Sequence, residues 1–356
     1  MLVTISSRNV NDAFIAFKKM YEVEPEYWRE LGEGKRQTME HIGPVITEYS
    51  HPTERVLFDS VRDANPFFHF FEALWILAGR KDVDFLKLFN PRMADYSDNG
   101  RTFHAAYGYR MRSHFQARDE EGYAYKYVDQ IYEVIRLLIK DLDTRQAVIG
   151  IWDPAEDLNV KSKDIPCNDL IFLKVRDNAL SMTVCCRSND IIWGCYGTNV
   201  VQFSMLQEYI ACALGIHVGV YRQISDSYHF YPNEPSCKRV MESDHEEREL
   251  YEIGQVKPYR LFERAQDHAE WLYQAGALTE YGAEMPKWIR GPVLPFFNDV
   301  GIPMYRAWMA YKGVYDEGLS SRNTRVNKAQ EILGECQASD WRLACERWLD
   351  RRREVE

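Results

Sequence analysis

Several features that mark other classes of protein are missing from this sequence. No apolar run is long enough to cross a bilayer, so the sequence predicts no membrane segment. A net charge of -10 provides no basic excess for nonspecific DNA binding, and we expect no direct contact with nucleic acid. Residues 1–10 lack the apolar stretch of an export signal. We therefore expect a cytoplasmic protein, in the host cytoplasm if its source is a virus.

The eight cysteines do not form a recognisable metal or disulfide pattern. The chain has no C-x-x-C pair, and Cys185 and Cys186 are adjacent on a predicted strand. Cysteines in a chain without an export signal are expected to be reduced. The sequence therefore predicts neither a disulfide framework nor a metal cofactor.

The chain is long and apolar enough for a large core. With 356 residues and 46% apolar side chains, it can form one or two domains. Apolar periodicity predicts an α+β fold. The predicted helices are 66–79, 125–140 and 199–214, and the predicted strands are 147–152, 170–175, 180–186 and 219–225, with a turn at Asp177-Asn178.

The composition changes after residue 231. The chain becomes charged and loop-rich, with an acidic run at 242–247, and then contains helical patterns at 263–273 and 327–353. We expect a catalytic domain at 1–231 and a divergent C-terminal extension at 232–356 that is loop-rich and then mostly helical.

Residues 166–231 contain a set of side chains suited to covalent chemistry on a nucleotide base. Cys167 follows a proline, and a thiolate can attack an electron-poor ring carbon. Arg187 with Ser188 can hold a phosphate, and Asn199 can pair with the edge of a pyrimidine.

The order and spacing of these residues resemble the thymidylate synthase family, which includes the pyrimidine hydroxymethylases of bacterial viruses. The resemblance covers about positions 30 to 231. It rests on Glu72-Ala73-Leu74-Trp75, Tyr107-Gly108, Asp143-Thr144-Arg145, Pro166-Cys167, residues 187–190, Asn199 and His229-Phe230-Tyr231. It implies a mixed sheet with packed helices, 5,10-methylenetetrahydrofolate as co-substrate, and a homodimer with shared active sites.

The resemblance also implies roles for individual residues. Cys167 is the nucleophile, Tyr107 lies near it, and Arg187 lies beside it, where a cation would lower the pKa of the thiol. The phosphate is bound by Arg187, Ser188 and Arg145 from the second chain, with Arg36 on a loop that closes over it. His229 and Tyr231 contact the sugar, and Asp190 and Asn168 lie toward the folate. Gln146 stands where the family usually has another arginine. For each residue the alternative is a structural role in a salt bridge or the core.

Glu72 lies within a strongly apolar helix, where an unpaired carboxylate is costly. Such surroundings raise the pKa of a carboxyl group. The family uses the matching glutamate to move protons near the C4 oxygen of the base through water, so we expect the same role here.

Asn199 determines the predicted substrate. A carboxamide offers an acceptor and a donor that complement N3-H and O4 of uracil, whereas relatives that act on dCMP have aspartate there. We therefore predict dUMP as the substrate. The spacing from Gly194 leaves Thr198 as a rival for this position.

Two departures from the family bear on the product. Asn168 follows the nucleophile where thymidylate synthases have histidine, and the chain ends in charged residues rather than an apolar segment that closes over folate and excludes water. We therefore predict 5-hydroxymethyl-dUMP, formed by water, ahead of thymidylate, formed by hydride transfer. Two further alternatives are a dCMP hydroxymethylase and an inactive nucleotide-binding scaffold.

Overall fold

The structure is a computed structural model. It describes residues 3–34, 37–243, 249–284, 292–314 and 321–354. Arg36 and most of the acidic run at 242–247 lie outside these residues.

An eight-stranded mixed sheet forms the centre of the fold. Its main path runs β1 (Val3–Ser7), β4 (Val45–Tyr49), β10 (His217–Phe230), β9 (Ala179–Asp190), β8 (Asn168–Arg176) and β7 (Val148–Gly150). β2 (Trp28–Leu31) pairs with β3 (Thr38–His41), which in turn pairs with the end of β10. β1 is parallel to β4 and β9 is parallel to β10, while the other pairs are antiparallel. The prediction of an α+β fold with a mixed sheet is confirmed.

The hairpin between β8 and β9 is formed as predicted. Asp177 and Asn178 at its turn have φ angles of 51° and 58°. Two successive left-handed residues make the turn whose twist matches that of paired strands, and asparagine and aspartate tolerate this conformation. Both flanking strands are longer than predicted, so Arg187 lies within β9 rather than at the end of a strand.

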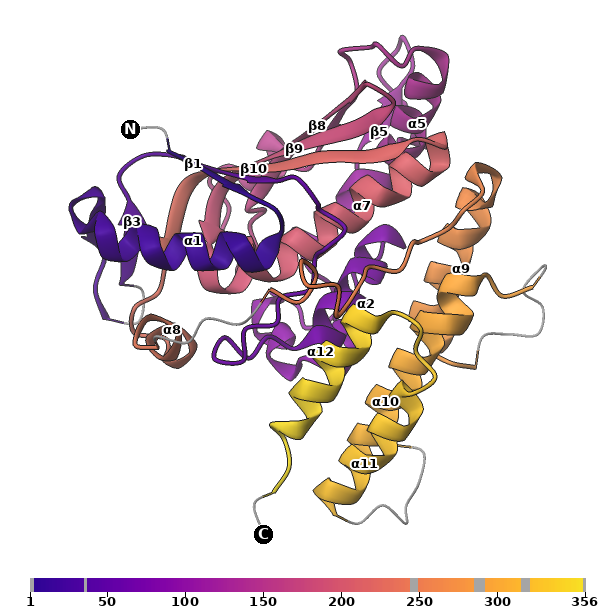
Figure 1. The fold of residues 1–356 in the computed structure, drawn as a ribbon. Helices are drawn as coiled ribbons and strands as arrows, with labels where there is room; N and C mark the ends of the chain where they lie inside the picture. The colour runs from indigo at the N-terminus through magenta and orange to yellow at the C-terminus, as the bar shows by residue number, and fades with distance from the viewer. Residues whose placement is uncertain (1–2, 35–36, 244–248, 285–291, 315–320, 355–356) are drawn as a thin grey trace.

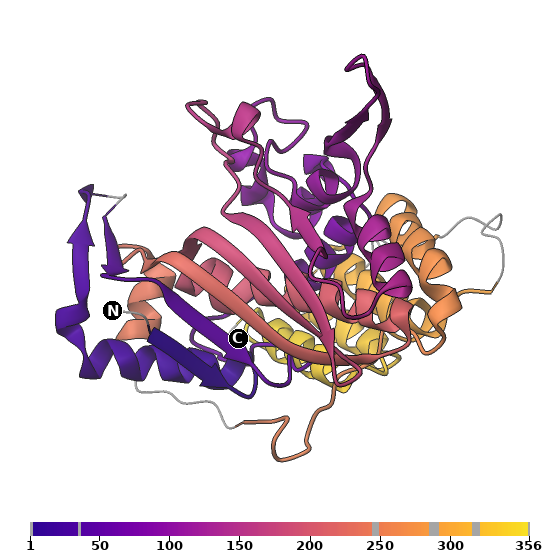
Figure 2. The ribbon, with the colours of Figure 1, turned by 90° about the horizontal axis from the view of Figure 1, so that it is seen from above.

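Helices cover one face of the sheet and leave the other open. α1 (Val10–Val23) and α7 (Asn199–Leu214) lie against one face, and Figure 2 looks onto the opposite face, where no helix covers the central strands (Figures 1 and 2). Burial alternates along β8, with Ile171 and Leu173 inside and Leu170 and Phe172 outside. Phe172 is 42% exposed on this open face.

Helix α2 (Pro66–Leu77) is buried along its whole length. Asn65 caps its first turn by accepting a hydrogen bond from Phe68 N, and Pro66 occupies the first helical position. The helix packs against α7 on one side and against the C-terminal helices on the other. This position places Glu72, near the middle of α2, in an apolar interior.

The C-terminal extension is mostly helical, as predicted. Its helices are α8 (Pro235–Met241), α9 (His268–Tyr281), α10 (Ile302–Lys312), α11 (Arg322–Leu333) and α12 (Ser339–Asp350). Aromatic contacts join this layer to α2: Phe70 stacks on Phe296 at 5.8 Å, and Phe67 lies 5.3 Å from Trp308. The division at residue 231 stays a prediction, although side chains on both sides of it share one core cluster.

Three predicted helix boundaries were wrong. The helix predicted at 125–140 begins at Gln130 as α5 (Gln130–Lys140), because Asp129 caps it and the preceding residues pair as β5 (Gln116–Arg118) with β6 (Ala124–Tyr127). The segment at 263–273 becomes α9, which starts later. The pattern at 327–353 is two helices, α11 and α12, since the chain turns after Gly334.

Short helical segments complete the described chain. They are α3 (Val83–Phe89), α4 (Tyr107–Tyr109), α6 (Pro154–Asp157), the 3-10 turns η1 (Pro25–Tyr27), η3 (Pro91–Tyr96) and η6 (Ala265–Asp267), and the wide turns η4 (Arg110–His114), η5 (Ile191–Thr198) and η7 (Phe297–Gly301). Among the described helices, none has both the length and the apolar character needed to cross a membrane.

Candidate active site

A cavity of about 460 Å³ brings together most of the predicted site residues. They come from α2, α4, β9, β10, the start of α7 and the loop before β8. The predicted residues that line the cavity are Glu72, Tyr107, Cys167, Arg187, Ser188, Asp190, Asn199, His229 and Tyr231.

Cys167 lies immediately before β8, and its backbone is fixed on two sides. Its carbonyl accepts a hydrogen bond from Arg187 N at 3.0 Å, and its N-H donates to the Tyr107 hydroxyl at 3.4 Å. Burial raises the pKa of the Cys167 thiol, and the charge of Arg187 acts in the opposite direction. The Arg187 cation therefore acts on the thiol in the expected direction, but desolvation outweighs it.

The Arg187 guanidinium is held at the edge of the cavity. Its Nε donates to Pro166 O at 2.7 Å and its Nη2 to Ile165 O at 3.2 Å, while Trp152 lies under the cation at 5.7 Å. Ser188 follows it on β9 and is half-buried. A fixed guanidinium with a neighbouring hydroxyl suits a bound phosphate.

The Glu72 carboxyl group is 8% exposed and receives one hydrogen bond, from Gln202 Nε2 to Oε2 at 2.7 Å. Burial raises the pKa of Glu72 to about 8, the bond from Gln202 opposes this rise, and the charge of Asp164 adds to it. The raised pKa expected from the sequence is present. A carboxyl group with this pKa can both give and accept a proton near neutral pH.

Asn199 begins α7 and presents a buried carboxamide to the cavity. Its Nδ2 donates to Asn189 Oδ1 at 3.1 Å, and Asn189 is held in turn by Gln223 and Ser225. Gly194 leaves room for this amide, since a Cβ at Gly194 would lie 3.0 Å from Asn199 Nδ2. Thr198 also lines the cavity, but it carries no carboxamide.

Asp190 and His229 mark one end of the cavity. The Asp190 carboxylate caps η5 by accepting hydrogen bonds from Ile192 N at 2.9 Å and Trp193 N at 3.3 Å. Burial raises the pKa of Asp190, and the charge of His229 opposes the rise. The His229 ring meets Tyr231 edge to face at 5.4 Å and contacts Ser227 Oγ through Nδ1 at 3.1 Å.

An apolar wall lies beside these polar groups. Trp75, Ile76, Leu86, Met93 and Phe103 line the cavity, and Trp193 adds an indole that is 42% exposed. A flat heterocycle with amide edges needs such a surface together with a carboxylate such as Asp190. The lining therefore fits the folate that the resemblance implies.

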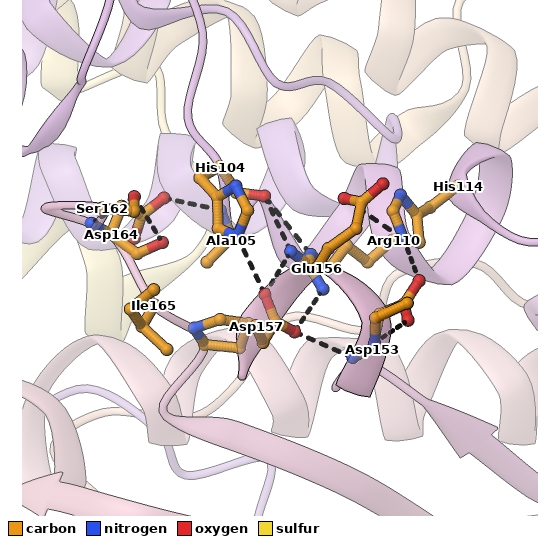
Figure 3. A network of polar contacts seen from close by, with 12 residues as sticks. His104, Ala105, Arg110, His114, Asp153, Glu156, Asp157, Ser162, Asp164 and Ile165 are labelled. Carbon is orange, nitrogen blue, oxygen red and sulfur yellow. Dashed lines mark hydrogen bonds and ion pairs between the residues drawn. The ribbon is translucent and has the colours of Figure 1, made fainter. Parts of the chain in front are cut away.

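A buried ionic network fixes the segment that carries Tyr107 (Figure 3). Arg110 is fully buried and donates to both carboxylate oxygens of Asp157, at 2.7 and 2.8 Å, while His104 Nε2 contacts the same carboxylate at 2.8 Å. Ala105 N donates to Asp164 Oδ2 at 2.8 Å. These contacts join the segment 104–110 to the loop that leads to Cys167. They therefore fix the position of Tyr107 relative to Cys167.

Among the described residues, His114, Asp153 and Glu156 have potential ligand atoms within 4.8 Å of one another. None of the three lines the cavity, and His114 is already hydrogen-bonded to Asp153 at 2.9 Å. The absence of a metal from the chemistry stays a prediction.

Comparison with known proteins agrees with this site. The family model described as Thymidylate synthase matches residues 62–272, which include every lining residue quoted above. The chain belongs to the thymidylate synthase family. The match continues past residue 231, where the predicted resemblance ended.

Phage proteins are among the similar relatives in this family. A deoxyuridylate hydroxymethyltransferase of Pseudomonas phage M6 is 40% identical over 87% of this chain and 84% of its own length. A protein of the same name from Bacillus phage SP01 is 43% identical over 58% of this chain and 53% of its own, so the matched region is about half of that relative. A putative thymidylate synthase of Methanothermobacter thermautotrophicus is 35% identical over 38% of this chain and 54% of its own length.

Two described residues of the predicted site, Asn168 and Arg145, do not line the cavity of this thymidylate synthase family member. Asn168 is fully buried and its Oδ1 accepts a hydrogen bond from the Cys186 thiol at 2.7 Å, so the structure does not support direct contact with folate. The strand β8 begins there and turns the side chain inward. Arg145 is exposed in the loop before β7, and its predicted role depends on a second chain. Arg36 lies outside the described residues.

Gln202 and Asp164 are among the polar cavity residues that the sequence reasoning missed. Gln202 lies three residues after Asn199 on α7, a spacing that places both on one helix face, so its signal was present. Asp164 precedes the nucleophile by three residues in a loop, where no periodicity indicates which way a side chain points.

Proposed function

We propose that this protein transfers a one-carbon unit from 5,10-methylenetetrahydrofolate to C5 of dUMP and that water completes the product as 5-hydroxymethyl-dUMP. The observation that carries the proposal is the cavity itself. Cys167, the Arg187 cation, the Asn199 carboxamide and the Glu72 carboxyl group all face one space of about 460 Å³.

Cys167 would start the reaction by adding to C6 of the base. C5 of uracil is a poor nucleophile until this bond forms, because the addition converts the ring to an enolate with electron density at C5. The thiol must lose its proton first, and its buried position opposes that loss. A bound phosphate beside Arg187 would fix the base over the sulfur, and Ser188 can donate to the same phosphate.

Asn199 and Glu72 would stabilise the enolate. The Asn199 amide can donate to O4 and accept from N3-H, which selects uracil over cytosine. Its orientation is fixed through Asn189, so it needs no rearrangement when the base binds. Glu72 would exchange protons with the O4 side of the ring through water.

Folate supplies the carbon that is transferred to C5. Asp190, Trp193 and the apolar wall would hold it, as the lining indicates. Two observations favour the hydroxymethyl outcome. The residue after the nucleophile is an asparagine turned into the core, and the M6 relative, 40% identical over most of this chain, is named a deoxyuridylate hydroxymethyltransferase.

A homodimer would complete the phosphate site. The open face of the sheet exposes Val148, Leu170 and Phe172, at 39%, 39% and 42%, and an apolar face of this kind is typical of a surface that another chain covers. In a symmetric dimer Arg145 would reach the phosphate of the partner subunit. We also infer that the enzyme works in the cytoplasm, where nucleotide and folate are available.

Mass spectrometry of the nucleotide after incubation with dUMP and methylenetetrahydrofolate tests the function. We expect a gain of CH₂O from wild-type protein, none from Cys167→Ser, and wild-type product from Cys185→Ser, a matched control at a half-buried cysteine on the open face. A gain of CH₂ with dihydrofolate would instead identify a thymidylate synthase. Product from dCMP alone would overturn the substrate, and no product from either would favour a scaffold.

A further inference from the structure

Gln202 is the one residue whose side chain hydrogen-bonds Glu72 among the described contacts. The two residues lie on helices that pack against each other, Glu72 on α2 and Gln202 on α7. Gln202 is 4% exposed, its Nε2 donates to Glu72 Oε2 at 2.7 Å, and both side chains line the cavity. The orientation of Glu72 therefore depends on this amide.

The other end of the same amide has no partner. Gln202 Oε1 is fully buried and accepts no hydrogen bond from the described residues. A buried carbonyl oxygen without a donor is costly, so a rotation of the amide that gives it one is favourable when Glu72 is protonated. Asn199 lies one helical turn earlier on the same face of α7, and both residues line the cavity where the base would bind.

We propose that Gln202 is a positioning residue that holds the Glu72 carboxylate where it can take a proton from the water that is added to the transferred carbon. The inference rests on the proposed function. It assigns to this chain a way of placing water where a thymidylate synthase must exclude it.

The chemistry balances with the groups present. After the carbon has been transferred, C5 carries a methylene joined by a double bond, and Cys167 is bonded to C6. Water gives one proton to the Glu72 carboxylate while its oxygen bonds to the methylene carbon, and the electron pair of that double bond moves toward O4. As the enolate collapses, the Cys167–C6 bond breaks, its electron pair leaves on sulfur, and the C5–C6 double bond is restored.

The amide of Gln202 suits both states of Glu72. It donates N-H to the carboxylate, and after a half-turn of the amide its oxygen can accept from the protonated acid. An apolar side chain of the same length can do neither. Loss of the donor also removes the bond that opposes the raised pKa of Glu72.

The variant Gln202→Met tests the proposal. We expect dUMP binding to stay within about threefold of wild type, because Cys167, Arg187 and Asn199 are intact. We expect the rate of hydroxymethyl formation to fall about tenfold or more, and the midpoint of its rise with pH to move upward.

The matched control is Gln207→Met. Gln207 is also a buried glutamine of α7 with an unpartnered Oε1, but its Nε2 bonds to Leu180 O at 2.8 Å and it does not line the cavity. Gln202→Asn, which keeps both ends of the amide one methylene shorter, replaces the Met variant if that protein does not fold. If the Gln202 variant matches the Gln207 control in rate and pH midpoint, Gln202 has no such role. If wild-type protein makes thymidylate, the proposed function itself fails, and this role fails with it.

Discussion

Arg352, which follows α12, forms a bidentate ion pair with Asp63, at 2.7 and 3.1 Å, almost three hundred residues earlier in the chain. Arg351 donates to the same carboxylate at 2.8 Å. The residue before Asp63 is Arg62, whose buried guanidinium donates to Ile192 O at 2.5 Å and lies 5.7 Å from the Trp193 ring. Arg351 and Arg352 are therefore connected, through Asp63 and its neighbour Arg62, to the Trp193 indole that lines the cavity.

The substitution Arg352→Ala should weaken folate binding more than nucleotide binding. Loss of the bidentate pair leaves Asp63 with the single bond from Arg351, so its loop is held less firmly and Trp193 loses part of its support, whereas Cys167 and Arg187 are untouched. Since the pair is partly exposed, the effect should be modest, and we expect KM for the folate to rise about threefold with little change in dUMP affinity.

Arg353→Ala is the control for this substitution. Arg353 donates hydrogen bonds to Asp350, Asn327 and Gln330, and none of its hydrogen bonds to the described residues reaches Asp63. Equal changes in both variants, or a loss of dUMP binding in Arg352→Ala, would show that the ion pair between Arg352 and Asp63 does not support the folate site at Trp193.

Glu72 should make the protein less stable as pH rises. Its pKa of about 8 in the folded chain lies above the value of 4.5 expected when the chain is unfolded. Between these values the folded state binds more protons than the unfolded state, so the free energy of unfolding falls with increasing pH, by up to about 1.4 kcal/mol per pH unit for this group. Glu72→Gln should flatten this dependence.

Urea unfolding at pH 5 and pH 8 measures this effect. Glu133→Gln, at a half-buried position of α5, is the control and should leave the slope of stability against pH unchanged. A Glu72→Gln protein with the wild-type slope would mean that the carboxyl group is ionised in the folded state.

Local patterns predicted much of the fold near the site. The start of α2 followed from Pro66 and the apolar run, and the β8–β9 turn followed from two residues that accept left-handed angles. The start of α5 was missed because apolar periodicity in residues 124–127 does not show that they pair with residues 116–118 as a hairpin. The N-terminal strands were not predicted either, since β1 and β4 gain their partners only in the folded sheet.

The site showed the same limit. Most of the predicted site residues line the cavity, but motifs could not show the direction of a side chain. Asn168 was placed toward the folate, whereas strand alternation turns it to Cys186 in the core. The burial of Cys167, which decides the direction of its pKa shift, is set by neighbours from other elements and could not be read from the segment around it.

Asn199→Asp should change the preferred base from uracil to cytosine. The aspartate can no longer donate to O4 of uracil, and it can accept from the amino group of cytosine when ionised. Its contact with Asn189 Oδ1 also becomes repulsive until Asn189 rotates. We expect dUMP affinity to fall about tenfold or more and dCMP affinity to rise, by calorimetry of both nucleotides. Thr198→Val should leave both affinities near wild type, and the reverse result would transfer the role to Thr198.

Phe172→Glu should separate the proposed dimer. Phe172 is one of the outward-facing residues of β8, and a carboxylate there would be buried against a second chain. We expect a dimer for wild type and a monomer with little activity for the variant in analytical ultracentrifugation. Ile139→Glu, at an equally apolar but exposed position of α5, should remain a dimer.

Subunit mixing tests whether the two sites are shared. Arg145→Ala and Cys167→Ser proteins should each be nearly inactive, but a hybrid dimer has one site with an intact Cys167 and an intact Arg145 from its partner. Random exchange should therefore restore about a quarter of wild-type activity. Failure to restore activity from stable dimers would place Arg145 outside the active site.

Gly108→Ala should disturb the site through the backbone of Tyr107. A Cβ at position 108 would lie 2.0 Å from the carbonyl oxygen of Ile76, so α4 and the end of α2 must move apart. We expect a loss of about 2–3 kcal/mol in the free energy of unfolding and slower turnover, because Tyr107 contacts the backbone of Cys167. Gly276→Ala in α9 is the control, since no heavy atom lies within 4 Å of its added methyl group, and it should be neutral or stabilising. Wild-type stability in Gly108→Ala would mean that the two helices are not in backbone contact.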